Sequence, residues 1–147
     1  MFVISVGIFI LALIFNPPDN KPQQTERQIE RQDLSTLLIG FLDKTDIERD
    51  NLEGTNVYGN CRVSNVEEVN QYAYYQTYHV DGDCEISCDM KSSDNYNFSV
   101  LLYTNKYESY CTSRFKGEFI NFTGTIKHVI GGIFVAGSIR INLAQIQ

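Results

Sequence analysis

Residues 116–143, KGEFINFTGTIKHVIGGIFVAGSIRINL, decide the fold. Apolar and polar residues alternate on both sides of Gly131-Gly132, which is the pattern of two half-buried β-strands. The glycine pair predicts a tight hairpin turn, because glycine adopts positive φ without steric cost. Each strand also carries one glycine on its apolar face, Gly124 and Gly137, where a sharp bend can form. The stretch therefore predicts the closing hairpin of a small, strongly coiled barrel.

The composition favours one β-rich domain behind an apolar leader. The chain has 147 residues, and its nine Tyr and nine Phe add to frequent Val and Ile, which are strand-forming residues. The 43% hydrophobic fraction is typical of a globular core. The formal net charge of −6 argues against broad affinity for nucleic acids or anionic lipids.

Four cysteines lie in the predicted domain. An even number behind an apolar leader predicts two disulfides in an oxidising compartment. Three pairings are possible, and the sequence does not choose among them. Free structural thiols and a zinc site are the alternatives, of which zinc is the weaker because paired CxxC motifs are absent. The disulfide candidates are Cys61, Cys84, Cys88 and Cys111.

Residues 1–15, MFVISVGIFILALIF, are almost wholly apolar and end at a proline-bearing stop. As a helix they span about 22 Å, which is shorter than the roughly 30 Å hydrocarbon core of a bilayer. We expect a membrane anchor, single-pass in the inner membrane, that holds the domain in the periplasm. The alternatives are a cleaved signal peptide, which would make the domain secreted, and an internal apolar strand or helix. Residues 16–24 predict a polar linker.

Residues 25–54 predict a helical lead-in that packs on one end of the barrel. Thr25 and Gln28 have the spacing of a capping box. A second box, Thr45 and Glu48, opens a short helix with Gly54 as its C′ residue. Between the two boxes runs an apolar stripe at helical spacing, formed by Leu34, Leu37, Leu38, Phe41 and Leu42.

Residues 55–147 predict the barrel itself. The first strand region starts at Thr55, with a candidate bend at Gly59; the second is residues 71–80, QYAYYQTYHV, and the third is residues 96–102. Residues 104–115 predict a loop or short helix before the closing hairpin. Five strands with a connector after the third match the order of the OB-fold. The chain is therefore expected to be mainly β, a five-stranded OB-like Greek-key barrel preceded by a helical region.

Two groups of residues resemble small exported bacterial OB-fold domains. The start of the barrel has their short helix, glycine and "G-x-V-x-x-V" run, at Gly54, Val57, Gly59, Val63 and Val66. Residues 116–118 and 122–126 resemble the "K-G-D…F-x-G-x-I" of tRNA-anticodon-like OB domains of the envelope. The resemblance covers residues 40–143 and departs from the pattern at Cys61 and at the insert 81–91. It implies a binding or assembly module rather than an enzyme.

No catalytic set is evident, so we expect no enzyme, no cofactor and no metal. The only histidines are His79 and His128, and no GxSxG, Walker, HExxH or EF-hand pattern occurs. Cys111 with a histidine is the alternative, as nucleophile and base. An acidic cluster flanks two of the cysteines and is expected to be a solvated loop, with a calcium site as the alternative. Its members are Asp81, Asp83, Glu85 and Asp89.

A tyrosine cluster is the candidate ligand-binding site. OB-folds bind ligands along their second and third strands, where aromatic rings offer stacking surfaces. The candidate residues are Tyr72, Tyr74, Tyr78 and Tyr103, with Lys91, Lys106 and Arg114 as candidates for its rim. The alternative is cross-strand packing of these tyrosines.

The expected function is an exported or membrane-tethered binding or adaptor module of the bacterial cell envelope. Its expected partner is an envelope protein, and residues 1–15 are its expected contact with the membrane. The alternative is a single-stranded nucleic-acid-binding OB-fold protein. The acidic balance and the lack of a basic stripe argue against that alternative.

Overall fold

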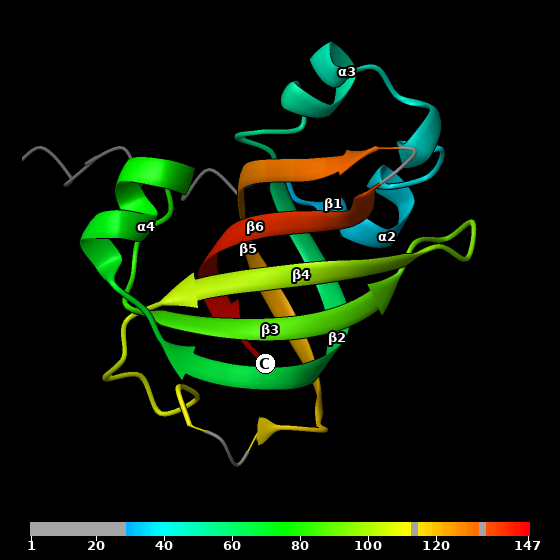
Figure 1. Cartoon of the computed structure of the whole chain (residues 1–147). Coiled ribbons are helices and arrows are strands. Elements are labelled where there is room, and N and C mark those ends of the chain that lie inside the picture. Colours follow the sequence, from blue (N-terminus) through cyan, green and yellow to red (C-terminus); the bar gives the residue numbers. More distant parts are fainter. Residues whose placement is uncertain (1–28, 113–114, 133–134) are drawn as a thin grey trace, which may run out of the picture.

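The computed structural model describes residues 29–112, 115–132 and 135–147 (Figure 1). Five long strands close into a barrel in the order β2-β3-β4-β6-β5, with β5 pairing back to β2. The β4–β6 pair is parallel and the other pairs of the barrel are antiparallel. This order is consistent with an OB-like fold, so the predicted mainly β, five-stranded barrel is confirmed. The strands are β2 (Asn56–Glu68), β3 (Cys84–Lys91), β4 (Asn97–Thr104), β5 (Phe119–Gly132) and β6 (Val135–Ile146).

The long strand β2 closes the barrel by pairing with β5 along its first half and with β3 along its second half. Arg62 lies where the two halves meet and pairs with both strands. Apolar side chains that alternate along the strands fill the interior, among them Val57, Ile86 and Ile141. A two-residue strand, β1 (Gln32–Asp33), adds to β2 in parallel.

The predicted closing hairpin is confirmed as β5 and β6, but Gly131 and Gly132 are not its turn, because both belong to β5. Gly132 still pairs with Val135 of β6, and residues 133–134 lie outside the described residues. The pairing register shifts between Thr123 and Gly124, as expected for a bend. A Cβ on Gly124 would lie 2.5 Å from the backbone oxygen of Asn142, so this close approach requires glycine.

The single amphipathic helix predicted over residues 34–42 is wrong, although its apolar residues do pack on the barrel. The chain forms α2 (Leu34–Leu37) and the 3-10 helix η1 (Phe41–Asp43), because Gly40 breaks the helix at φ +68. Leu34, Leu38 and Phe41 are buried against the barrel core. Thr25 and Gln28 lie outside the described residues.

The capping box of Thr45 and Glu48 is confirmed at the start of α3 (Asp46–Asp50). The Glu48 side chain accepts from the Thr45 backbone at 2.7 Å, and this bond holds the pKa of that carboxyl below its usual value. Gly54 is not the C′ residue that was predicted, since the helix is capped at Asn51. Gly54 has φ +84 and donates its backbone N–H to Ile126 at 2.7 Å, which ties this segment to β5.

The second predicted strand is wrong, because residues 71–78 form a helix, α4 (Gln71–Tyr78). Asn70 caps it by accepting the backbone N–H of Ala73 at 3.2 Å, and His79 ends it in the left-handed region at φ 56. The second strand of the barrel is instead β3, which forms within the predicted insert 81–91. Figure 1 shows α4 at the end of the sheet where β3 begins and β4 ends.

All four cysteines are paired, as predicted, and this excludes the free-thiol and zinc alternatives. Cys61–Cys88 joins β2 to β3, and Cys84–Cys111 joins β3 to the connector before β5. Two cystines indicate a domain outside the cytoplasm. Within the ranges that the structure describes, no helix has the length and apolarity needed to cross a membrane. The anchor and linker predicted for residues 1–24 lie outside those ranges.

Candidate functional site

Three of the four predicted tyrosines meet between α4 and the sheet. Tyr74 and Tyr78 lie one turn apart on the helix, with their ring centroids 5.7 Å apart. The Tyr74 ring also lies 5.9 Å from that of Tyr103, which projects from β4. Tyr72 is not part of the group, since its side chain is 76% exposed. The structure thus assembles this cluster between a helix and a strand rather than along two strands.

A charged network lies beneath the tyrosines. Arg140 of β6 stacks over the Tyr78 ring at 3.6 Å and donates to the Tyr103 hydroxyl. That hydroxyl in turn donates to Glu85 at 2.5 Å. The Arg140 guanidinium lies 3.8 Å from the same carboxylate, and both side chains are nearly buried, at 12% and 8% exposed. The network holds α4 against the sheet by joining β3, β4 and β6 to the helix.

Two tyrosines of this cluster, Tyr74 and Tyr103, have raised pKa values. Burial, with the hydrogen bond to Glu85 next in size, raises the pKa of Tyr103 far above its usual value. Burial and then the Glu85 charge raise the pKa of Tyr74. Arg140 covers one face of Tyr78, and Tyr74 packs against Tyr103. Part of the aromatic surface of the cluster is therefore covered by the protein's own side chains, and ligand binding by these tyrosines stays a prediction.

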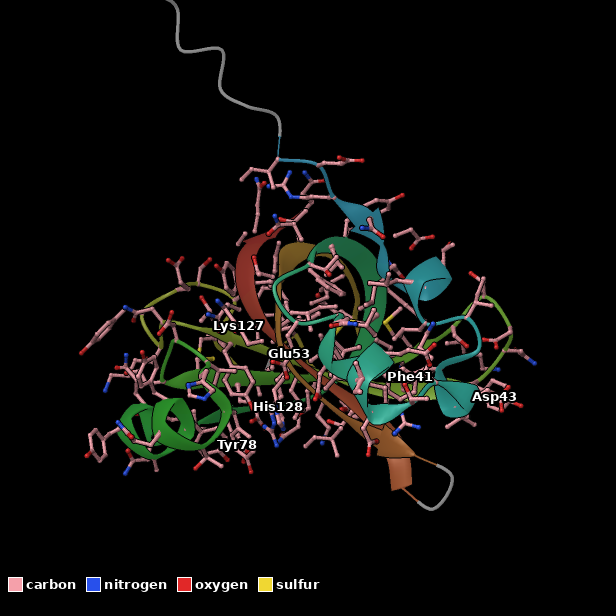
Figure 2. The ribbon with its side chains drawn as sticks, turned by 90° about the horizontal axis from the view of Figure 1, so that it is seen from above. Phe41, Asp43, Glu53, Tyr78, Lys127 and His128 are labelled. Atoms are coloured by element: carbon pink, nitrogen blue, oxygen red, sulfur yellow. A yellow bond between two sulfur atoms is a disulfide. The ribbon has the colours of Figure 1, made fainter. Side chains whose placement is uncertain are left out.

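The two histidines lie at the edges of α4. His128 of β5 lies 5.6 Å from the Tyr78 ring, and its Nδ1 is 3.5 Å from a Glu53 carboxylate oxygen (Figure 2). His79 packs edge-on against Tyr75. The alternative of a Cys111 nucleophile is wrong, because that sulfur is in a disulfide.

The acidic residues around β3 are separate from one another. Asp81 bonds to Asn142, Asp83 accepts the backbone N–H of Lys106 at 2.8 Å, and Glu85 belongs to the buried network. Among residues 29–112, 115–132 and 135–147, no group of three or more His, Cys, Asp or Glu side chains could hold a metal ion.

An open groove of about 730 Å³ is lined by residues of β2, β3 and β4 and by Phe119 of β5. Its lining includes the buried Cys61, Met90 and Phe98. Strand register places Arg62 opposite both Asp89 of β3 and Phe119 of β5, and Asp89 opposite Ser99 of β4. Directly opposite residues share a face of the sheet, so these four side chains form one row across four strands. Beside that row, Lys91 lies opposite Asn97, and Asn60 donates to Asn121 at 2.9 Å.

The groove combines exposed cations with an exposed aromatic residue. Phe119 is 70% exposed, although a ring of this size is usually buried. Arg62 and Lys91 are also exposed, and in the described part of the chain neither forms an ion pair with a carboxylate. A protein of net charge −6 thus presents two available cations and an aromatic ring in one hollow.

Of the two predicted rim residues that the structure describes, Lys91 lies in this groove and Lys106 does not. Lys106 lies elsewhere and binds Glu68 at 3.1 Å, which raises the pKa of the lysine. Arg114 lies outside the described residues. Sequence reasoning missed Arg62 and Phe119, although alternation with buried Cys61 and Ile120 already placed both on an outward face.

Neither a scan against protein-family models nor a search of curated proteins returned a match to this chain.

Proposed function

We propose that the domain is a non-enzymatic binding or adaptor module of a bacterial cell envelope. It engages an envelope partner through the groove on β2, β3 and β4. The observation that carries this proposal is the open hollow of about 730 Å³, whose size suits a binding site and whose Phe119, Arg62 and Lys91 side chains are unshielded. Exposed aromatic and arginine side chains are enriched at binding surfaces.

The cystines support a location outside the cytoplasm. Residues 1–15 are proposed to tether the domain to the inner membrane, facing the periplasm, or to direct secretion if they are removed. Among the described residues that line the groove there is neither a histidine nor a free thiol, and Asp89 is the one carboxylate. Such a lining suits reversible binding better than general acid–base or nucleophilic catalysis.

The test is capture of partners from detergent-solubilised membranes of the source organism. The full chain is compared with a groove variant, Arg62→Glu/Lys91→Glu, and with a control of equal charge change, Lys44→Glu/Lys127→Glu. We expect the wild-type chain and the control to retain the same partner, and the groove variant to lose at least nine-tenths of it. Equal retention by the groove variant would show that the groove is not the binding site.

Single-stranded nucleic acid is the second candidate, which the two available cations and Phe119 favour. The net charge of −6 and the position of Asp89 beside Arg62 argue against it. A labelled 15-mer of deoxythymidine decides between the two. Binding that weakens steeply with salt would support the candidate, and an unchanged anisotropy at low salt would dismiss it.

A further inference from the structure

We infer that the groove binds an acidic oligosaccharide, a short glycan that carries carboxylates. This inference rests on the proposed function and adds the chemistry of the ligand. Three properties of the groove lead to it: its charges, its neutral polar side chains and its single exposed ring.

The charges of the groove favour a ligand with a few separate anionic groups. Arg62 and Lys91 are exposed cations, and a guanidinium binds a carboxylate through two parallel hydrogen bonds. Asp89 lies directly opposite Arg62, in the middle of the row. A polyphosphate would bring acceptor-only groups against that carboxylate, whereas a sugar hydroxyl can donate to it. The mixture of charges therefore fits an acidic ligand that also carries hydroxyl groups.

The neutral side chains fit the same ligand. Asn60 and Asn97 are exposed, and each amide presents both donors and an acceptor. Ser99 adds a hydroxyl at the end of the row. A sugar hydroxyl both donates and accepts a hydrogen bond, so neutral amide and hydroxyl side chains can bind it through both of its roles. One of the two amides, Asn60, is already oriented by its bond to Asn121 at 2.9 Å.

Phe119 supplies the apolar contact. Phe119 lines the groove and is 70% exposed, so its ring can offer a flat surface to the C–H face of a sugar ring. Successive stacked bases would need successive aromatic rings. Among the described residues that line the groove, the one other ring is that of the buried Phe98. The row from Phe119 to Ser99 crosses three strand spacings, about 14 Å. That length suits a short oligomer rather than a single sugar.

The experiment uses the full chain and calorimetry with three probes. Hexamers of galacturonic acid and of hyaluronan are the acidic probes, and chitohexaose is the neutral one. We expect at least one acidic hexamer to bind with at least tenfold higher affinity than chitohexaose. Arg62→Gln and Phe119→Ala should each weaken that binding at least tenfold. Lys127→Gln, on the far part of β5, should leave it within twofold.

Each contrary outcome overturns a defined claim. If no acidic hexamer binds, yet membrane partners are still captured through the groove, the ligand chemistry is wrong and the proposed function stands. If an acidic hexamer binds Arg62→Gln and Phe119→Ala as tightly as it binds the wild-type chain, its site lies elsewhere. If the deoxythymidine oligomer binds more tightly than every glycan, the ligand is a nucleic acid. If neither glycans nor membrane partners depend on the groove, both proposals fail. Both variants alter exposed side chains, so unchanged circular dichroism will verify their folds.

Discussion

Replacing Tyr103 by phenylalanine removes one oxygen atom from the network that seats α4. The ring remains, so its contact with Tyr74 is kept and almost no cavity forms. The lost hydroxyl accepts from Arg140 and donates to Glu85. The substitution therefore tests whether these polar contacts, rather than the packing of the rings, hold the helix.

The expected loss follows from the two bonds and from what can replace them. A hydrogen bond to a charged group contributes about 1.5–3 kcal/mol. Arg140 already lies 3.8 Å from Glu85 and can close on it directly, which recovers part of the loss. We expect unfolding to become easier by about 2 kcal/mol, which corresponds to a melting temperature about 8 °C lower for a domain of this size.

Urea unfolding followed by circular dichroism measures this change, since the chain has no tryptophan. The control is Tyr107→Phe, whose ring is 84% exposed and whose hydroxyl loss should cost less than about 0.5 kcal/mol. Tyr103→Phe should also speed amide hydrogen exchange more in α4 than in β5. Equal stability of the Tyr103→Phe protein and the wild-type protein would refute the network as the support of α4.

Three further outcomes are expected. The pKa of Tyr103 is raised in the folded state, so the stability that its protonated hydroxyl contributes is complete below pH 10.0 and is lost as the pH rises further. Above pH 10.0 the urea midpoint of Tyr103→Phe should therefore fall less with pH than that of the wild-type protein. Cys84→Ala/Cys111→Ala opens a cystine with a sequence separation of 27 and should cost about 3.5 kcal/mol in urea unfolding; a loss below 1 kcal/mol would contradict the loop-entropy argument. Gly137→Ala places a methyl group against the Phe98 ring and should lower the free energy of unfolding by about 1–3 kcal/mol. If the clash with Phe98 causes this loss, Gly137→Ala should cost less in a Phe98→Leu background; strict additivity of the two substitutions would exclude the clash as the cause.

The barrel was predictable where local pattern and tertiary packing agree. In residues 116–143 the alternation of apolar residues, the bend glycines and the hairpin position all point to the same two strands. The cystines followed from the number of cysteines and the apolar leader, but their pairing depends on contacts between β3 and its neighbours.

Residues 71–78 show why the rest was not predictable. Tyrosine and threonine favour strands, and their alternation strengthened that interpretation. The helix depends on the Asn70 cap and on the docking of Tyr78 against Arg140, which is distant in the sequence. The groove was missed for a similar reason. Arg62, Asp89 and Phe119 become neighbours only through the register of three strands.

The two cystines also determine how the domain carries a mechanical load. A pull on the two ends of the chain reaches Cys61, crosses to Cys88, runs back along β3 to Cys84 and leaves through Cys111. Residues 84–88 of β3 carry that load, while the rest of the backbone between residues 61 and 111 is shielded, so on the order of 150 Å of chain cannot extend. The segment closed by the two cystines holds all of β3 and β4 and, with them, most of the groove. Stretching can peel away β5 and β6 while the face that would hold a ligand keeps its covalent frame.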